Sequence, residues 1–464
     1  MKITIENIGV FRFAQYELAD LTIVCGKNNT GKTYATYALY GFFDFFRRGY
    51  TITVSNKDIS LLLETGSLSI ELNRSIDILN KYLKDACTKY KKYLPKIFAA
   101  QEKYFTDAKF GFQIDSNDII EQKKTPYEYS YQTSKKDFLQ ISESEDGNIL
   151  RINLLSKGND TDENSAIRLS LSRIIGDTIK EILFHDLIPE CFIASAERTG
   201  AVIFKEELNF EKNSILREVA TSEEIRIENI VDKIYNTSYA LPVRRNIDFI
   251  RNLESISKED GMLYKEHPEI IEYLNSMVGG EYKISKEGIY YAPTKNIKLS
   301  IGESASSIRS LLDIYFYLRY VARKGHMLMI DEPEMNLHPS YQRLYARILA
   351  MLVNFGVKVF ITTHSDYIVK EFNTLLMLNS KKEKESIKKL IITYNYCEQQ
   401  FLDASKVKMF ISEVSNILLP GNKRKTKAQT LSQIEVTPNF GFSAYSFDDT
   451  INEMNNIQET LYFA

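Results

Sequence analysis

A short glycine-bounded stretch carries the residue types best suited to phosphate chemistry in this sequence. It runs from Gly26 to Thr33 with the spacing Gly-x-x-x-x-Gly-Lys-Thr, which is the full phosphate-binding loop pattern. Glycines at both ends let the backbone curl, so that successive amide groups point at an anion. Lys32 is expected to reach the β- and γ-phosphates of a nucleotide, and the Thr33 hydroxyl to bind Mg²⁺. The residues expected to hold ATP and Mg²⁺ are Gly26, Lys27, Asn28, Asn29, Thr30, Gly31, Lys32 and Thr33.

Two adjacent carboxylates end an apolar run much further along the chain. Met327-Leu-Met-Ile precedes Asp331 and Glu332, a pattern that predicts a buried strand with acids at its end. Asp331 would hold Mg²⁺ through water, because hard oxygen ligands suit this ion. Glu332 would orient or deprotonate the water that attacks the γ-phosphate. Acids that merely cap a strand are the alternative, and the phosphate-binding loop in the same chain favours the catalytic interpretation.

A histidine follows the next apolar run. Residues 357–363 are expected to form another buried strand, and His364 stands directly after it. A lone histidine is usually structural, but at this strand end an imidazole could contact the γ-phosphate. We therefore predict a sensor role for His364, which joins Lys32 and Glu332 as the expected catalytic residues.

Apolar segments on both sides of the loop supply the context that such a loop needs. Leu21–Cys25 is expected to be a buried strand that leads into it, and residues 34–46 a buried helix whose positive N-terminal end faces the phosphates. Residues 1–25 alternate apolar and polar side chains, as in a strand pair. A further helix is expected at 340–352, between the two later strands.

Residues 51–190 are expected to be an α+β insertion in the nucleotide-binding core. Apolar side chains recur there first at helical spacing and then in alternation with polar ones. Many are aromatic, and we expect them to serve core packing and a partner surface rather than chemistry. The expected elements are a helix at 75–98, strands at 110–114, 127–131 and 149–155, a loop at 157–164 and a helix at 166–187.

A short apolar strand ending in Glu197 and Arg198 follows the insertion. These two side chains form either an ion pair without functional consequence or part of a site, and the sequence favours neither. Residues 203–280 are charged and expected to be mostly helical. Residues 281–300 are expected to form two strands around a turn at 286–288.

The C-terminal part is less informative. Residues 390–396 resemble a strand, and a helix is expected beyond them. The basic run Lys423–Lys427 is either a solvated loop or a contact for nucleic acid or another partner. Asp160 and Asp162 form an acid pair in a polar stretch without a preceding strand, so no nuclease motif is expected.

Composition sets the remaining bounds. A chain of 464 residues can hold two or three domains, and its 44% hydrophobic and 26% charged residues are typical of a soluble globular protein. The net charge of −2 gives no global electrostatic footprint of a nucleic-acid binder. No apolar run approaches the ~18–20 residues of a membrane span, and the N-terminus lacks a signal-peptide profile. We expect a cytoplasmic protein without a membrane partner, in keeping with four scattered cysteines, Cys25, Cys87, Cys191 and Cys397.

Three motifs together resemble the ABC-type ATPases of the chromosome-maintenance, RecF and overcoming-lysogenization (OLD) group. They lie at 26–33, 330–339 (Ile-Asp-Glu-Pro-Glu-Met-Asn-Leu-His-Pro) and 361–365 (Ile-Thr-Thr-His-Ser), in the family's order. The resemblance implies a head-to-tail dimer or a higher homo-oligomer, with ATP between one subunit's phosphate loop and the other's signature helix. The matching signature segment is 302–311. It implies nucleotide contacts from Ser306, Ser307 and Arg309, which alternatively belong to a plain helix N-cap.

Within this group the resemblance is greatest to stand-alone ATPases of anti-phage defence, such as AriA of the PARIS system, with PtuA of Septu next. Glu197-Arg198 also resembles an element of the OLD-like subgroup. The resemblance implies hydrolysis of ATP to ADP and phosphate by a sensor or scaffold subunit. This subunit would control a separate nuclease or toxin of the Toprim or HNH type, in response to a phage protein or nucleic acid. A DNA-repair ATPase of the RecF type is the alternative, and a transporter subunit is disfavoured by the missing Leu-Ser-Gly-Gly-Gln.

These expectations combine into an α/β fold. It is a P-loop ATPase of ABC type, in which helices flank a mixed sheet and the α+β insertion separates the loop from the signature segment. The expected ranges are 1–50 for the N-terminal part of the core, 51–190 for the insertion, 191–300 for a helical arm with strands, 301–400 for the signature, acid-strand and histidine part of the core, and 401–464 for a C-terminal extension.

Overall fold

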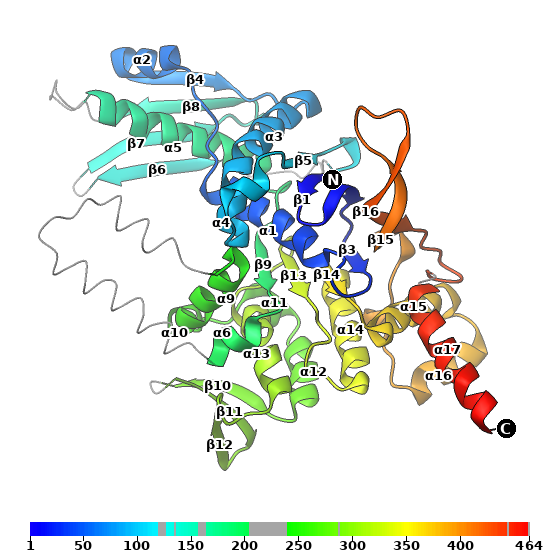
Figure 1. Cartoon of the computed structure of the whole chain (residues 1–464). Helices are drawn as coiled ribbons and strands as arrows, with labels where there is room; N and C mark the ends of the chain where they lie inside the picture. The colour runs from blue at the N-terminus through cyan, green and yellow to red at the C-terminus, as the bar shows by residue number, and fades with distance from the viewer. Residues whose placement is uncertain are drawn as a thin grey trace, which may run out of the picture. The chain divides into compact units, whose positions relative to one another are not determined.

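A computed structural model describes residues 1–118, 127–133, 136–155, 164–203, 239–285, 288–442 and 445–462 (Figure 1). Several sequence predictions fall outside these residues: the loop at 157–163 with Asp160 and Asp162, the turn residues 286–287, and the part of the helical segment between 204 and 238. The described chain divides into two compact units, which comprise Met1, 42–90 and 111–189 in the smaller and 2–41, 91–110 and 190–464 in the larger.

The larger unit is built on a six-stranded mixed sheet. Its strand order is β16 (Lys425–Ile434), β15 (Val407–Leu418), β3 (Leu21–Cys25), β14 (Lys358–Thr363), β13 (Met327–Asp331) and β9 (Cys191–Ala194). All neighbours are parallel except β15 and β16, which form a hairpin. Every residue of β3 and β13 is buried, as expected of parallel strands covered on both faces. The predicted α/β class with a mixed sheet is confirmed, and so are the three strands expected at 21–25, 327–331 and 357–363.

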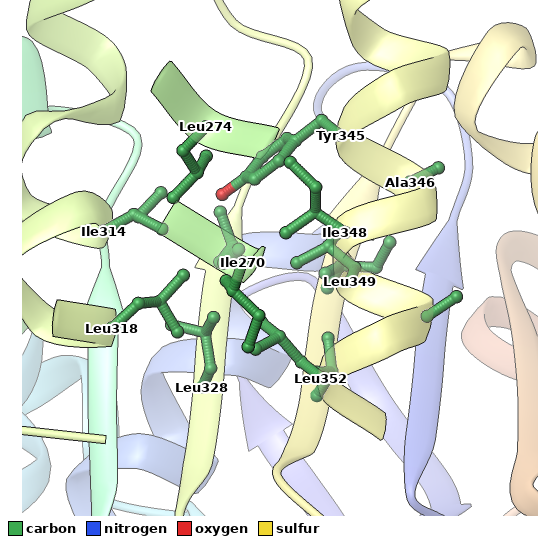
Figure 2. Packing of buried hydrophobic residues seen from close by; sticks show 14 of the residues in the cluster. Ile270, Leu274, Ile314, Leu318, Leu328, Tyr345, Ala346, Ile348, Leu349 and Leu352 are labelled. Atoms are coloured by element: carbon green, nitrogen blue, oxygen red, sulfur yellow. The ribbon is translucent and has the colours of Figure 1, made fainter. Parts of the chain in front are cut away.

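Helices on the sheet complete the core that holds β13 in place. They include α12 (Glu269–Val278), α13 (Ser306–Tyr320), α14 (Pro339–Asn354) and α15 (Asp366–Lys381). Figure 2 shows Leu328 of β13 among apolar side chains of three of them. Burial of each such side chain contributes about 1.5–3 kcal/mol, so the strand end has little freedom to move. The labelled residues of this cluster are Ile270, Leu274, Ile314, Leu318, Leu328, Tyr345, Ala346, Ile348, Leu349 and Leu352.

The other elements of the larger unit are mostly short. The predicted strand pair is the hairpin of β1 (Lys2–Ile8) and β2 (Phe11–Glu17). Residues 281–300 form three strands, not the two predicted, because Lys295 and Asn296 make a second tight turn that the sequence reading missed. The remaining elements are α4 (Leu94–Phe98), α6 (Arg198–Ile203), α9 (Leu241–Arg251), α10 (Leu253–Ile256), α11 (Met262–Glu266), β10 (Glu281–Ser285), β11 (Gly288–Thr294), β12 (Ile297–Ser300), α16 (Glu385–Thr393) and α17 (Tyr445–Tyr462).

The strand expected at 390–396 is wrong, since residues 385–393 form helix α16. Ile387, Leu390 and Ile391 recur at helical spacing and pack against the core, whereas Ile392 is 76% exposed. A strand would have pointed Leu390 and Ile392 to the same face. The helical period therefore outweighs the strand preference of the β-branched residues.

The smaller unit contains a four-stranded antiparallel sheet in the order β4, β8, β7, β6. Its aromatic residues pack with one another, as predicted: the Phe42 ring centroid lies 5.2 Å from that of Phe112 and 5.5 Å from that of Tyr90. The predicted helix at 75–98 is interrupted, because Pro95 restarts it as α4. The elements of the unit are α2 (Asn56–Thr65), β4 (Ser67–Glu71), α3 (Ile76–Tyr90), β6 (Glu128–Thr133), β7 (Lys136–Glu143), β8 (Ile149–Leu154) and α5 (Asn164–Phe184), and α1 (Lys32–Arg48) and β5 (Lys109–Gln113) cross its boundaries.

Candidate active site

The parallel register of the large sheet brings the predicted site residues to one edge. Thr363 lies opposite Cys25, and Asp331 lies opposite Thr362. The residues that follow β3, β13 and β14 therefore emerge at the same edge, since parallel strands end on the same side. These residues are the ones that the sequence predicted to act together: the loop from Gly26, then Glu332, then His364.

The loop backbone adopts a curl that only glycine allows at two points. Gly26 has φ +146° and Gly31 has φ +96°, both in the region that residues with a side chain rarely adopt. A Cβ at Gly26 would lie 2.8 Å from the carbonyl oxygen of Ser412, and one at Gly31 would lie 2.5 Å from the Val10 side chain. Helix α1 begins at Lys32, so its free N–H groups face the loop. The curled backbone and the helix end fit a phosphate group.

Lys32 is held inside the loop by its own backbone. Its Nζ donates to the carbonyl oxygens of Gly26 and Lys27, both at 2.9 Å. The residue is only 6% exposed, and burial lowers the pKa of its ammonium. The carboxylates of Glu332, Asp331 and Glu334 oppose this effect but do not outweigh it, so an anionic ligand would further stabilise the charged form.

Three oxygen-bearing side chains meet at the end of β13. Thr33 Oγ1 donates to Asp331 Oδ2 at 2.9 Å, and the Thr362 hydroxyl donates to Asp331 Oδ1. Burial raises the pKa of Asp331 to about 6, so a nearby cation would stabilise its ionised form. A hydroxyl and a carboxylate are the hard donors that Mg²⁺ prefers. The donor set fits the predicted ion.

Glu332 stands next to this group in a strained backbone conformation. Its φ is +54°, and its N–H donates to the Thr362 carbonyl at 3.1 Å. His364 Nδ1 lies 3.6 Å from Glu332 and 3.1 Å from Glu334. The interaction with His364 lowers the pKa of Glu332, and the same interaction raises the pKa of His364. Glu332 is therefore ionised near neutral pH, as a proton acceptor must be.

The structure also brings residues to the site that the sequence analysis left out. Glu334 is 6% exposed and accepts hydrogen bonds from the His364 N–H at 2.7 Å and the Thr363 hydroxyl at 2.9 Å. It thereby fixes the end of β14. Its place in the 330–339 motif, directly after Pro333, was the available signal.

Glu197 and Arg198 have separate partners at this edge. Glu197 accepts a hydrogen bond of 2.9 Å from the Tyr37 hydroxyl of α1, while the Arg198 guanidinium donates to backbone carbonyl groups, including that of Asp331 at 2.8 Å. The interpretation as a simple pair between these two side chains is therefore wrong.

The signature residues begin helix α13. The N-cap position is Ala305, without a side-chain hydrogen bond, so the interpretation of the serines as a plain N-cap is wrong. Ser306 is exposed and Ser307 is half-buried. Arg309 donates to the Gly302 carbonyl at 3.1 Å and to that of Ser304. Within the described parts of the chain, no hydrogen bond joins these residues to the phosphate-binding loop.

Three further observations concern the rest of the described chain. Among the described residues, no group of three or more His, Cys, Asp and Glu side chains lies close enough together to hold a metal ion. No described helix has the length and apolar character needed to cross a membrane. The basic run predicted to be a loop covers the turn of the β15–β16 hairpin and the start of β16, with Lys423, Arg424, Lys425 and Lys427 exposed.

Comparison with known proteins gives one family match. Residues 1–369 match the family described as the AAA ATPase domain. No curated protein matches the sequence.

Three solved structures align with most of the chain at low similarity. An SMC head bound to the C-winged helix domain of ScpA is 11% identical, with a TM-score of 0.33, and the alignment covers 94% of this chain and 97% of that one. The SMC head domain from Thermotoga maritima is 9% identical, with a TM-score of 0.29 and coverage of 94% and 98%. An SMC head domain bound to the C-terminal domain of ScpA derived from Pyrococcus furiosus is 11% identical, with a TM-score of 0.31 and coverage of 98% of both chains. These TM-scores are low, so the fold description rests on the strand order and the family match.

Proposed function

The chain belongs to the AAA ATPase domain family and is a P-loop ATPase of ABC type, and we propose that it is the sensor or scaffold subunit of an anti-phage defence system. In this role it converts ATP and water to ADP and phosphate, and its nucleotide state controls a separate nuclease. The observation that carries the ATPase part is the meeting of Lys32, Asp331 and Glu332 at one sheet edge.

We assign the loop and its lysine to nucleotide binding. The amide groups of residues 26–33 and the Lys32 ammonium surround the β- and γ-phosphates. Lys32 exchanges its two carbonyl partners for phosphate oxygens, which form stronger, charge-assisted bonds. Thr33 and Asp331 hold Mg²⁺, whose charge offsets the negative charge of the phosphates.

We assign proton transfer to Glu332 and the sensing of the γ-phosphate to His364. The ionised Glu332 accepts a proton from the attacking water as the water oxygen bonds to the γ-phosphorus, and the bond from that phosphorus to the β,γ-bridging oxygen breaks, which releases ADP. His364 lies against Glu332 and Glu334, and 42% of its side-chain surface is exposed. Its raised pKa favours the cationic form, which suits contact with an anionic phosphate.

A second copy of the chain completes the site in this proposal. Ser306 and Ser307 stand at the uncapped start of α13, where N–H groups are free to bind an anion. Because these residues make no hydrogen bond to the loop of their own chain within the described residues, they are available to a facing subunit. Arg309 shapes the loop before the helix through its bonds to Gly302 and Ser304.

The defence role rests on the resemblance of three motifs to the ATPases of PARIS and Septu. Its partners would be a Toprim or HNH nuclease or a toxin, and its trigger a phage protein or nucleic acid. ATP state can control such a partner only if the partner makes different contacts in the two states.

The first experiment separates an ATPase without effector activity from a nuclease. The pure protein is incubated with ATP and Mg²⁺ or Mn²⁺, together with plasmid, single-stranded DNA or tRNA. We expect ATP hydrolysis and no cleavage. Cleavage that disappears in the Lys32→Ala variant, with no other protein present, would contradict the proposal.

The second experiment tests the defence role in cells. The gene is expressed with its neighbouring genes in a bacterial host, and phage plaques are counted for the wild type and for Lys32→Ala. We expect the wild type to reduce plaque number and the variant to lose this protection. Equal plaque numbers, together with hydrolysis that DNA stimulates in vitro, would instead support the RecF-type repair ATPase.

A further inference from the structure

The Arg198 side chain is almost completely buried, with 1% of its surface exposed. Within the described part of the chain, the hydrogen bonds of its guanidinium go to backbone carbonyl oxygens. The two Nη atoms donate to Asp331 at 2.8 Å, Ser195 at 2.9 Å and Glu332 at 2.9 Å, and Nε donates to Ser310 at 2.9 Å. One guanidinium therefore joins the ends of β9 and β13 to helix α13.

The use of an arginine here requires an explanation other than stability. Arginine stays charged in proteins, and buried charges are normally paired with an opposite charge. Electrostatic compensation comes from the buried carboxyl group of Asp313 on α13 and from the Glu332 carboxylate, both of which interact with the Arg198 charge. What an arginine provides is a rigid fork of donors pointing in fixed directions, which a lysine ammonium lacks. The fork satisfies four carbonyl groups from three elements at once.

One of these carbonyl groups belongs to the strained residue Glu332. A glutamate at φ +54° persists only where its surroundings hold it. Its N–H donates to the carbonyl and to the hydroxyl of Thr362, at 3.1 and 3.3 Å, and its own carbonyl accepts from Arg198 at 2.9 Å and from the Met335 N–H at 3.2 Å. With both sides of the residue held, the direction of the Glu332 side chain is set.

The other end of the network lies on the helix that carries the signature residues. Ser310 follows Ser306 by one helical turn, and its carbonyl oxygen accepts the bond from Arg198 Nε. A shift of α13 would therefore pull on the guanidinium that also holds Glu332. Packed networks of this kind transmit small displacements because their parts cannot deform independently.

We propose that Arg198 is a positioning residue for ATP hydrolysis, which holds the backbone of Glu332 in its strained conformation and ties it to the start of α13. The inference rests on the proposed role of Glu332 as proton acceptor. It assigns a role to the Glu197-Arg198 element that is independent of any contact between these two side chains.

The test is Arg198→Lys, which keeps the charge and removes the fork. We expect kcat for ATP to fall about 100-fold, the loss typical of a reacting group displaced by about 1 Å. KM and the dissociation constant of Mg·ATP should change less than about threefold, because the loop does not depend on Arg198. Arg198→Met, which removes the buried charge while filling similar space, should show the same loss.

A double-mutant cycle separates positioning from general damage. If Arg198 acts through Glu332, adding Arg198→Lys to Glu332→Gln should cost less than about threefold in kcat beyond the single Glu332→Gln change. A further loss close to 100-fold in that background would overturn the proposal. So would an unchanged kcat in both Arg198 variants when Mg·ATP binding is normal, and this result would leave the proposed ATPase function intact.

Arg347 supplies the matched control. It is also buried, but it pairs with Glu371 at 2.6 Å and lies on α14 away from these carbonyl groups. We expect Arg347→Met to lower the melting temperature while kcat stays within about threefold of the wild type. If both Arg198 variants fail to fold while Arg347→Met folds, Arg198 is a structural residue and the proposal is wrong. If the wild type neither binds nor hydrolyses ATP, the proposed function fails first.

Discussion

Asp313 offers a prediction about stability that can be made quantitative. Its side chain is completely buried on α13, and Oδ2 has no hydrogen-bond partner among the residues that the structure describes. Burial raises the pKa of this carboxyl group to about 6, although the Arg198 charge acts in the opposite direction. Tyr282 and Tyr345, whose pKa values the Asp313 charge raises, face it from β10 and α14. We predict that Asp313→Asn stabilises the protein at high pH relative to low pH.

The size follows from the shift. An unfolded aspartate has a pKa of about 3.9, whereas that of folded Asp313 is about 6. The folded state therefore binds this proton more strongly than the unfolded state by about 3 kcal/mol. This contribution is fully present below about pH 4 and is lost as the pH rises through 6. Asparagine resembles the neutral carboxyl group at every pH. The difference in unfolding free energy between variant and wild type should therefore grow by up to about 3 kcal/mol from pH 4 to pH 8.

Melting temperatures of both proteins measured at intervals between pH 4 and pH 8 test this. The melting temperature of the variant minus that of the wild type should rise mainly between pH 4 and pH 7. Glu303→Gln is the control, because hydrogen bonding to Ser300 lowers the pKa of that exposed carboxylate and predicts a small trend of opposite sign. A difference between Asp313→Asn and wild type that is constant with pH, or that falls as the pH rises, would refute the reasoning.

Three predictions concern the nucleotide site. Lys32→Ala should abolish Mg·ATP binding in a calorimetric titration, because the loop loses its phosphate-directed cation, and near-normal affinity would contradict the assignment of the loop. Glu332→Gln should bind ATP and hydrolyse it about 10²–10⁴-fold more slowly, so turnover within a factor of two of the wild type would exclude Glu332 as the proton acceptor. Mixing Lys32→Ala chains with Ser306→Arg chains should recover part of the ATPase activity, since each mixed dimer holds one intact composite site. The absence of recovery in confirmed mixed assemblies would argue against sharing of the site between subunits.

Local patterns were sufficient to predict the elements that carry the loop and the two later motifs. The predicted strand at Leu21–Cys25 has the same first and last residue as the observed one, because a short apolar run directly precedes a glycine that begins the loop. The strand that ends at Asp331 was also predicted, from an apolar run that two carboxylates end. In both cases the residues predicted to form the site begin within one or two positions of the strand end. A correct prediction of the strand therefore also locates these residues.

The contacts missed by the sequence analysis are those that join distant segments. Arg198 lies 112 residues from Ser310 and 133 from Asp331, and no local pattern signals that these groups meet. The available signal was the position of a charged residue shortly after an apolar strand. Many surface residues occupy such positions, so this signal is not specific. The strand predicted at 390–396 failed for a related reason: β-branched residues suggest a strand locally, whereas packing of Leu390 and Ile391 on the core selects a helix.

The strain at Glu332 connects these observations. A single residue after a buried strand has no local reason to adopt φ +54°, and a sequence pattern cannot predict it. The conformation is held because Thr362 binds the N–H, while Arg198 and the Met335 N–H bind the carbonyl. Thr362 and Arg198 come from strands or helices beside β13, so the whole sheet edge must be assembled before the side chain points in its final direction. It follows that the direction of Glu332, the proposed proton acceptor, is set by tertiary structure, and that weakening any neighbour of Glu332 should reduce turnover before it reduces nucleotide affinity.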